Sequence, residues 1–527
     1  MYDSSAYTEC KARPEAALYN GGVLKNKALI LTHGRSNTAS ATYTPTFVLH
    51  NLTAGTLFTF STWVKIKGSE SAPIRVTLAS EDEDECVGTV VAKRGCWSFL
   101  KGGFVIPTSS NISHLYFEHQ SAEERNISIV IASTSLQPFT YQQWEANRQL
   151  RINAARKRVV TIHVSDKEGN RLEGAVVQVQ QISQDFPFGS AIANTILGNL
   201  PYQNWFVKRF NAAVFENELK WNATEPEQGK ANYTIPNQML EFVRANQITA
   251  RGHNIFWENP KFTPLWVRNL TGPELQAAVD SRIQSLMNNY KDEFVNWDVN
   301  NEMLHFDFYE QRLGPNATLH LFQKAHQSDP LATLFMNEYN VVETCADSNS
   351  TVDAYISRIR QLKLGGVSMD GIGLQGHFSR PNPPLMRAIL DKLATLHLPI
   401  WLTEVDIKSN FDTETQALYL EEVLREGFSH TSVNGIIMWS AIHSNGCFRM
   451  CLTDNNFRNL PAGNVVDKLL MEWKTGLMKG LSDERGSYSF NGFLGEYMVI
   501  VEYGNRTATS TFSLNRDAET RHFSIQL

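Results

Sequence analysis

From residue 187 onward, apolar strand-like runs alternate with amphipathic helical segments, and this alternation constrains the fold more than any other feature. Eight strand candidates can be read, at 188–193, 211–217, 248–257, 294–302, 333–340, 371–378, 399–407 and 435–442. Continuous apolar strands separated by helices are typical of a parallel sheet. Eight such units over roughly 290 residues match a (β/α)₈ barrel in number and size. We therefore predict an α/β fold with a TIM barrel over residues 187–475.

The N-terminal part has a different pattern, with short strands separated by regularly spaced turns. The candidates lie at 27–32, 46–52, 56–66, 74–80, 89–93, 114–118 and 127–134. This spacing predicts an antiparallel β-sandwich, to which we assign residues 1–145. The acidic run at 81–85 is interpreted as a solvated loop, with a calcium site as the alternative.

Two further β-rich segments flank the barrel, at 158–181 and 484–515. We divide the flanks into a linker and β accessory segment at 146–186 and a C-terminal β segment at 476–527. Our hypothesis is that the two pair into one small sandwich with the barrel inserted between them. Two separate β extensions are the alternative.

Composition excludes several classes of protein. The net charge is −6 and the basic residues are scattered, which argues against a nucleic-acid-binding face. A run of 18 apolar residues is absent, so we expect no transmembrane helix and no membrane partner. No metal-binding triad, phosphate loop or Ser/His/Asp arrangement is evident, so we expect neither a metal nor an organic cofactor. We also expect a monomer.

Cysteines and glycosylation sequons favour an extracellular protein. Nine Asn-x-Ser/Thr sequons occur, at 51, 111, 126, 222, 232, 269, 316, 349 and 505. Among six cysteines, Cys86 with Cys96 and Cys447 with Cys451 are spaced for local disulfides, with free thiols as the alternative. The sequence begins MYDSSAYTEC, without the apolar segment of a signal peptide. We expect an extracellular or cell-wall protein whose signal peptide is not in this sequence; an intracellular protein is the alternative.

Polar and aromatic side chains gather where the predicted barrel strands end, which is where barrel enzymes place their catalytic groups. A single charged residue in such an apolar strand is unremarkable, but a ring of them over strands two to eight indicates a functional site. The candidates in chain order are Glu216, Asn217, Lys220, His253, Trp257, Asn301, Glu302, Tyr339, Gln375, His377, Glu404, Asp406 and Trp439.

Two carboxylates in this ring, Glu302 and Glu404, end strands on opposite sides of the barrel. Facing carboxyl groups in a tryptophan-lined pocket suit glycoside hydrolysis, in which one carboxyl holds a proton and the other stays ionised. We expect His377, oriented by Asp406, to keep Glu404 charged. We expect Trp257 to raise the pKa of Glu302 by desolvation.

Five motifs in order resemble glycoside hydrolase family 10, the retaining endo-β-1,4-xylanases, over roughly 185–475. They are ENELKW (216–221), RGHNIFW (251–257), WDVNNE (297–302), GIGLQGHF (371–378) and LTEVDI (402–407). The resemblance implies that Glu302 is the general acid/base and Glu404 the nucleophile, with carboxyl groups about 5–5.5 Å apart.

The same resemblance implies that xylan or xylo-oligosaccharides are the substrate and that most of the ring binds them. Glycone-side contacts are then Glu216, Asn217 and Lys220, helped by His253, Trp257, Asn301, Gln375, His377 and Trp439. Tyr339 then lies toward the aglycone side. Two other functions stay open: a retaining hydrolase of another β-1,4-glycan, and a non-hydrolytic xylan-binding protein.

Residues 20–140, with STWVKI (61–66) and LYFEH (115–119), resemble a family 22 carbohydrate-binding module. The whole arrangement, with its β tail, is similar to the plant members of the xylanase family. Trp63, Tyr116 and Glu118 are our candidate ligand contacts in the module; a buried place in the sandwich core is the alternative for the aromatic side chains.

The chain also departs from the family pattern at two places. Ser440 follows the strand-eight tryptophan, and Cys447 stands where the xylanases usually carry a second tryptophan. After RGHNIFW the family commonly has His-Ser-Gln, whereas this chain has Glu258, Asn259 and Pro260. We expect an altered wall and altered aglycone binding, which could favour transfer of the glycosyl group to a sugar instead of water.

Overall fold

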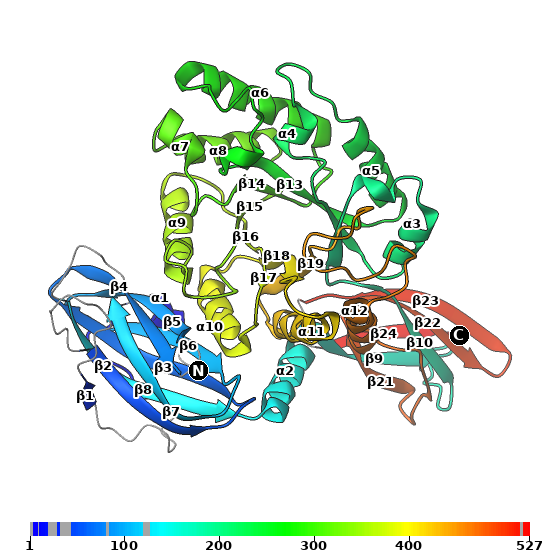
Figure 1. Cartoon of the computed structure of the whole chain (residues 1–527). Coiled ribbons are helices and arrows are strands. Elements are labelled where there is room, and N and C mark those ends of the chain that lie inside the picture. The colour runs from blue at the N-terminus through cyan, green and yellow to red at the C-terminus, as the bar shows by residue number, and fades with distance from the viewer. Residues whose placement is uncertain are drawn as a thin grey trace.

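A computed structural model describes residues 4–8, 10–18, 29–31, 44–80, 84–119, 127–516 and 520–527 of the chain. It contains three β-rich units (Figure 1): an N-terminal sandwich in blue, a central barrel from green to yellow, and an accessory sandwich built from both flanks of the barrel.

The central unit is a closed barrel of parallel strands. Its strands are β11 (Phe188–Ile192), β12 (Ala212–Phe215), β13 (Thr249–Trp257), β14 (Asn296–Asn301), β15 (Thr333–Glu338), β16 (Gly371–Leu374), β18 (Ile400–Ile407) and β19 (Val433–Met438). Each pairs with the next in parallel, and β19 pairs with β11, which closes the sheet. A two-residue strand, β17 (His377–Phe378), pairs with the end of β18. The predicted TIM barrel is therefore confirmed.

Helices surround the barrel strands (Figure 1) and bury their apolar faces against them. They are α3 (Leu200–Val207), α4 (Trp221–Thr224), α5 (Thr234–Ala245), α6 (Gly272–Tyr290), α7 (Phe308–Leu313), α8 (Ala317–Ser328), α9 (Val352–Leu364), α10 (Pro383–Leu393), α11 (Thr413–Ser429) and α12 (Pro461–Glu472). Short 3-10 turns lie at Asn194–Ile196, Pro260–Phe262 and Ala394–Leu396.

The N-terminal unit is an antiparallel sandwich with its own apolar core. One sheet has the order β1-β2-β7-β4-β5 and the other β6-β3-β8. After a short helix α1 (Ser4–Thr8), the strands are β1 (Leu29–Leu31), β2 (Thr44–Leu52), β3 (Leu57–Lys67), β4 (Ser71–Ala79), β5 (Asp84–Lys93), β6 (Ser98–Val105), β7 (Ser110–His119) and β8 (Ser128–Phe139). Strand β6 was not among the predicted strands. Residues 81–83 of the acidic run and the sequon at Asn126 lie outside the described residues.

Helix α2 (Tyr141–Arg156) joins this sandwich to the accessory unit, where we expected the sandwich to end and a linker to begin. A capping box between Thr140 and Gln143 starts the helix. Its buried Arg148 forms ion pairs with Glu422 and Glu426 of α11, so the helix is fixed on the outside of the barrel.

The accessory unit pairs the two flanks of the barrel. Strand β10 (Val176–Gln184) lies between β20 (Met478–Leu481) and β22 (Gly495–Tyr503), and β23 (Arg506–Leu514) pairs with β22. Strand β9 (Lys157–Ser165) lies between β21 (Ser487–Phe493) and β24 (Thr520–Gln526). The two sheets enclose one apolar cluster.

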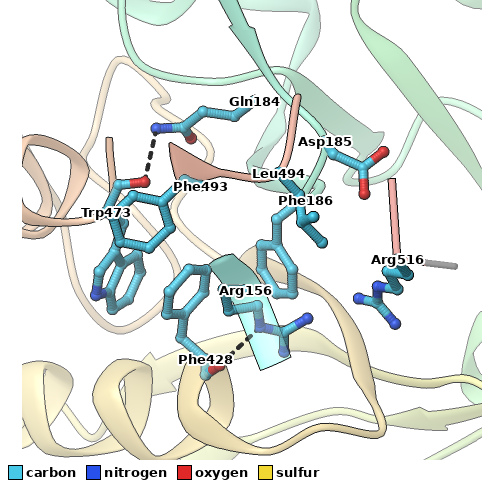
Figure 2. Close-up of a pocket in the computed structure, with 9 residues that line it drawn as sticks. All are labelled: Arg156, Gln184, Asp185, Phe186, Phe428, Trp473, Phe493, Leu494 and Arg516. Atoms are coloured by element: carbon cyan, nitrogen blue, oxygen red, sulfur yellow. Dashed lines mark hydrogen bonds between the residues drawn. The ribbon is translucent and has the colours of Figure 1, made fainter. Parts of the chain in front are cut away.

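Arg156 fastens this unit to the barrel at a small pocket (Figure 2). Its guanidinium donates to the carbonyl oxygens of Phe428, His430 and Val433 and lies 4.5 Å from the Phe186 ring centroid. The contact joins the end of α2, directly before β9, to the end of α11 and the start of β19.

All six cysteines form disulfides. Cys447 pairs with Cys451, as predicted, but the Cys86–Cys96 pairing is wrong. Cys96 pairs with Cys10, and Cys86 pairs with Cys345, 259 residues away in the barrel unit. Sequence proximity misled here because Cys86 lies in the buried cluster shared with the barrel. In the described part of the chain, no helix is long and apolar enough to cross a membrane.

Candidate active site

Glu302 follows directly on β14 and lies at the mouth of the barrel with a left-handed backbone, φ 62°. Its side chain is 7% exposed; Oε2 accepts from Trp257 Nε1 at 2.7 Å and Oε1 from Gln375 Nε2 at 3.1 Å. Burial raises the pKa of Glu302 to about 7, although both hydrogen bonds lower it. Part of our expectation for Trp257 is therefore wrong in sign, because its indole N–H stabilises the ionised carboxylate.

Glu404 lies within β18 and has the opposite electrostatic environment. Its Oε2 is 3.4 Å from His377 Nε2, its Oε1 accepts from Asn337 Nδ2 at 2.7 Å, and His253 Nδ1 is 4.0 Å away. Burial alone would raise the pKa of Glu404, but the charge of His253 and the hydrogen bonds from His377 and Asn337 lower it to about 2.

His377 owes its charge to a second carboxylate. Asp406 Oδ1 is 2.9 Å from His377 Nδ1, on the side of the ring opposite Glu404. Burial opposes protonation, but the charges of Asp406 and Glu404 and the hydrogen bonds to them together outweigh it and raise the pKa of His377 to about 10. The structure thus brings together the Asp406–His377–Glu404 series that the sequence analysis predicted.

Asn337 connects the surroundings of the two carboxylates. Its Nδ2 donates to Glu404 and also to Asn301 Oδ1 at 2.9 Å, and its carbonyl accepts from the Glu302 backbone N–H at 3.1 Å. The backbone N–H of Glu404 in turn donates to the carbonyl of Gln375 at 2.7 Å. Glu302 and Glu404 are therefore held by one hydrogen-bond network over β14, β15, β16 and β18.

The predicted glycone-side residues form a second group at the same end of the barrel. Lys220 Nζ donates to Asn217 Oδ1 at 2.8 Å, and Asn217 Nδ2 donates to Glu216 at 3.0 Å. The ammonium of Lys220 lies 4.8 Å from the Trp257 ring and 5.8 Å from the Trp439 ring. Burial lowers the pKa of Lys220, although the charges of Glu404 and Glu216 oppose this.

Among the described residues, the buried polar atoms of this region that lack a protein hydrogen-bond partner include Asn301 Nδ2 and His253 Nε2. His253 is fixed from its other side, because Nδ1 lies 2.8 Å from Asp298. Its ring also meets Trp439 edge to face, with centroids 5.2 Å apart. Unpaired buried polar atoms at a site mouth are suited to bind ligand hydroxyl groups.

Tyr339 lies beside Glu302. Burial raises the pKa of the Tyr339 phenol, and the charge of Glu302 raises it further. Its ring stacks on His305 at 3.8 Å and 9°. His305 comes three residues after Glu302 and donates its backbone N–H to the Glu302 carbonyl. His305 was not predicted.

The candidate ligand contacts in the N-terminal sandwich separate into two kinds. Trp63 is 0% exposed and packs with Phe99, so the prediction that it contacts a ligand is wrong and the core alternative holds. Tyr116 and Glu118 lie on the outer face of β7, where Glu118 pairs with Arg75. For these two, ligand contact stays a prediction.

The two departures from the family pattern have different consequences. Glu258 is 1% exposed and hydrogen-bonded to Asn300 and the Tyr309 backbone, so Glu258 itself does not line the aglycone wall, and altered aglycone binding stays a prediction. Cys447 is closed into a disulfide, and the next residue, Phe448, is 58% exposed with its ring 5.8 Å from His377. An aromatic face is therefore still available on this wall.

Sequence reasoning missed Asn337, His305, His443 and Phe448. For Asn337 a signal existed, because it comes two residues before Tyr339 in the predicted strand 333–340, and alternate residues of a strand lie on the same face. His443, which hydrogen-bonds Glu216, lies in an irregular loop beyond β19, where periodicity gives no indication.

Comparisons with known proteins agree with this geometry. The family model for glycosyl hydrolase family 10 matches residues 178–466. Endo-1,4-beta-xylanase 5 of Arabidopsis thaliana is 36% identical over 427 residues, covering 80% of this chain and 74% of that protein. The anti-sigma-I factor RsgI6 of Acetivibrio thermocellus is 38% identical over 392 residues, covering 73% of this chain and 50% of that protein.

Among solved structures, xylanase 10B of Thermotoga petrophila in complex with xylobiose is similar, with 24% identity and a TM-score of 0.49. The similarity covers 55% of this chain and 94% of that one. On the family match and the level of identity to its relatives, this chain belongs to glycosyl hydrolase family 10.

Proposed function

We propose that this protein is a retaining endo-β-1,4-xylanase with Glu302 as general acid/base and Glu404 as nucleophile. One observation carries the proposal: the pKa of Glu302 is about 7 and that of Glu404 about 2, within one hydrogen-bond network. Between these values the first carboxyl holds a proton and the second is ionised, which is the starting state of the reaction.

In the first step, a carboxylate oxygen of Glu404 attacks the anomeric carbon and forms a glycosyl–enzyme bond. The bond from that carbon to the glycosidic oxygen breaks, and the oxygen takes the proton of Glu302 as it leaves. Asn337 and His377 hold Glu404 in place for the attack.

In the second step, the ionised Glu302 takes a proton from water, and the water oxygen attacks the same carbon. The glycosyl–Glu404 bond breaks, so the product keeps the original anomeric configuration and both carboxyl groups regain their starting states. The expected separation of the two carboxyl groups, about 5–5.5 Å, belongs to this mechanism.

The substrate we propose is the xylan backbone. The unpaired Asn301 Nδ2 and His253 Nε2, with the Lys220–Asn217–Glu216 chain, offer hydrogen bonds of both polarities to ring hydroxyl groups. The names of the Arabidopsis relatives favour β-1,4-xylan among β-1,4-glycans.

The test is incubation with xylohexaose, with product masses and anomeric configuration measured, alongside Glu404→Gln and Glu302→Gln. We expect shorter β-configured products from the wild type and none from Glu404→Gln. With a dinitrophenyl xylobioside, whose leaving group needs no proton, Glu302→Gln should still release a burst of phenol, because the first step survives. Inverted products, or a burst from Glu404→Gln instead, would contradict the assignment.

Two other functions make different predictions. A hydrolase of another β-1,4-glycan would cleave cello-oligosaccharides in preference to xylo-oligosaccharides. The other alternative is a non-hydrolytic xylan-binding protein. Such a protein would bind xylohexaose without cleaving it.

We also propose that the glycosyl group can pass to a sugar acceptor as well as to water. Of the two departures that motivated this idea, only the Cys447–Cys451 wall with its exposed Phe448 now supports it. Products longer than xylohexaose at high oligosaccharide concentration are expected, and purely hydrolytic products would refute it.

We propose that the protein works outside the cell, on cell-wall xylan. Its three disulfides support this, since such bonds persist in oxidising compartments. The asparagines of the eight described sequons are all solvent-exposed, as N-glycosylation requires. Endoglycosidase sensitivity of the protein secreted by a eukaryotic host would test this.

A further inference from the structure

The loop after β15, residues 339–347, is joined covalently to the N-terminal sandwich. Cys345 in this loop forms a disulfide with Cys86 of β5. Both are largely buried, and Cys86 lies in the same apolar cluster as the barrel residues. The disulfide therefore attaches the sandwich to a loop at the mouth of the barrel.

Asp347, two residues after Cys345, contacts a residue near the start of the same loop and a neighbouring histidine. Its Oδ2 accepts from Asn340 Nδ2 at 2.8 Å and lies 2.9 Å from His305 Nε2. His305 Nδ1 is 2.7 Å from Glu338 Oε1. Burial opposes a charge on His305, but the hydrogen bonds to Glu338 and Asp347 outweigh it and raise its pKa to about 9.

The bridged imidazolium fixes the Tyr339 ring by stacking on it at 3.8 Å. This pair lies on the Glu302 side of the site, since the His305 N–H donates to the Glu302 carbonyl. The group that leaves takes its proton from Glu302, so the Tyr339–His305 stack lies on the aglycone side.

The sandwich contacts the barrel at several further points. Asn382, at the start of α10, donates to Glu85 Oε1 at 2.8 Å and to the Gly103 carbonyl at 3.1 Å. A Cβ at Gly103 would come within 2.4 Å of Pro384, so only glycine permits this approach. Lys101 adds a partly buried ion pair with Asp391 of α10. The sandwich can therefore act as a fixed support.

We propose that the Cys86–Cys345 disulfide and Asp347 are positioning residues for the aglycone side, through which the N-terminal sandwich fixes the His305–Tyr339 stack. The proposal deepens the proposed function and rests on it. It assigns to the sandwich a part in substrate positioning that is independent of glycan binding by its own surface.

The test compares a double variant, Cys86→Ser with Cys345→Ser, against a matched control, Cys10→Ser with Cys96→Ser, which opens a disulfide remote from the loop. Each is assayed on end-labelled xylohexaose and on dinitrophenyl xylobioside, whose small aglycone makes little use of that side. For the first variant we expect kcat/KM on xylohexaose to fall about tenfold, mainly through KM, because a stacking face is displaced.

The pattern of cleaved bonds in xylohexaose should change as well, while kcat/KM on the aryl xylobioside stays near the wild-type value. A merely structural role would lower kcat/KM on both substrates in parallel and leave the pattern of cleaved bonds unchanged. The control variant should keep the wild-type ratio of kcat/KM on xylohexaose to kcat/KM on the aryl xylobioside.

Asp347→Ala keeps the disulfide and serves if the double variant does not fold. It should reproduce the loss on xylohexaose and the altered bond pattern. Parallel losses on both substrates, or no change in either variant, would overturn the proposal. If the wild type cleaves neither substrate, the proposed function fails and this inference with it; if the wild type cleaves both and the variants match it, only this inference fails.

Discussion

Replacing Trp257 with Phe should move the alkaline limb of the pH–rate profile upward. The activity we propose needs Glu404 ionised and Glu302 protonated, so kcat/KM should rise through the pKa of Glu404, about 2, and fall through that of Glu302, about 7. The indole of Trp257 donates to Glu302 Oε2 at 2.7 Å, and Phe cannot donate.

The size of the shift follows from the lost hydrogen bond. A hydrogen bond to a charged group contributes about 1.5–3 kcal/mol, and one pKa unit corresponds to about 1.4 kcal/mol. The bond favours only the ionised form of Glu302, which is buried, so its loss should raise the pKa by about one to two units. The alkaline limb should then lie near pH 8 to 9, on the same estimate.

The assay is kcat/KM on a soluble xylo-oligosaccharide between about pH 1 and 10, a range set by the need to include both limbs of the bell. The variant also changes packing against the sugar, so its plateau should fall, but a lower plateau does not move a limb. Phe262→Leu is the control, since Phe262 stacks on Trp257 at 3.8 Å and leaves the N–H in place. An unmoved or lowered limb in Trp257→Phe would refute this account of Glu302.

Three further changes test other parts of the structure. Asn337→Ala removes the donor to Glu404 and should raise the acid limb by about one pH unit, as measured in the same assay. Phe448→Ala should lower kcat/KM on xylohexaose about fivefold, the effect of about 1 kcal/mol of stacking; an unchanged value would exclude sugar contact. Arg148→Leu deprives the buried Glu426 of one partner and should lower the free energy of unfolding by about 3 kcal/mol, measured by urea denaturation.

The barrel could be predicted because most of its strands are largely apolar runs that alternate with helical segments, and an apolar run is itself a sign of burial. Strand β6 could not be predicted, because SFLKGGFV contains two glycines, and only the neighbouring segments of the folded protein explain why these positions lack side chains. A Cβ at Gly102 would lie 1.9 Å from the Val87 carbonyl oxygen, and one at Gly103 would meet Pro384. Such glycines are a tertiary requirement, and a strand pattern read along the sequence counts them as breaks.

Helix α2 was missed for a related reason. Its sequence has little apolar periodicity, and the side chains that it buries include Arg148 and Arg156. Each guanidinium donates to a partner more than 270 residues away, Glu426 for Arg148 and the Phe428 carbonyl for Arg156. When a helix is stabilised by ion pairs and carbonyl groups from distant parts of the chain, its own sequence does not indicate which face is buried.

The same distinction applies to the active site. Glu302 and Glu404 could be identified because each is a charged residue at or near the carboxyl end of a buried strand, and this is a local property. Their pKa values are not local: Glu302 depends on Trp257 from β13 and Gln375 after β16, and Glu404 on Asn337 from β15. The identity of the two carboxylates is thus encoded strand by strand, whereas their opposite protonation states are encoded in the pairing between strands. A substitution at Trp257, Gln375 or Asn337 should therefore change the pH dependence while both catalytic carboxylates stay in place.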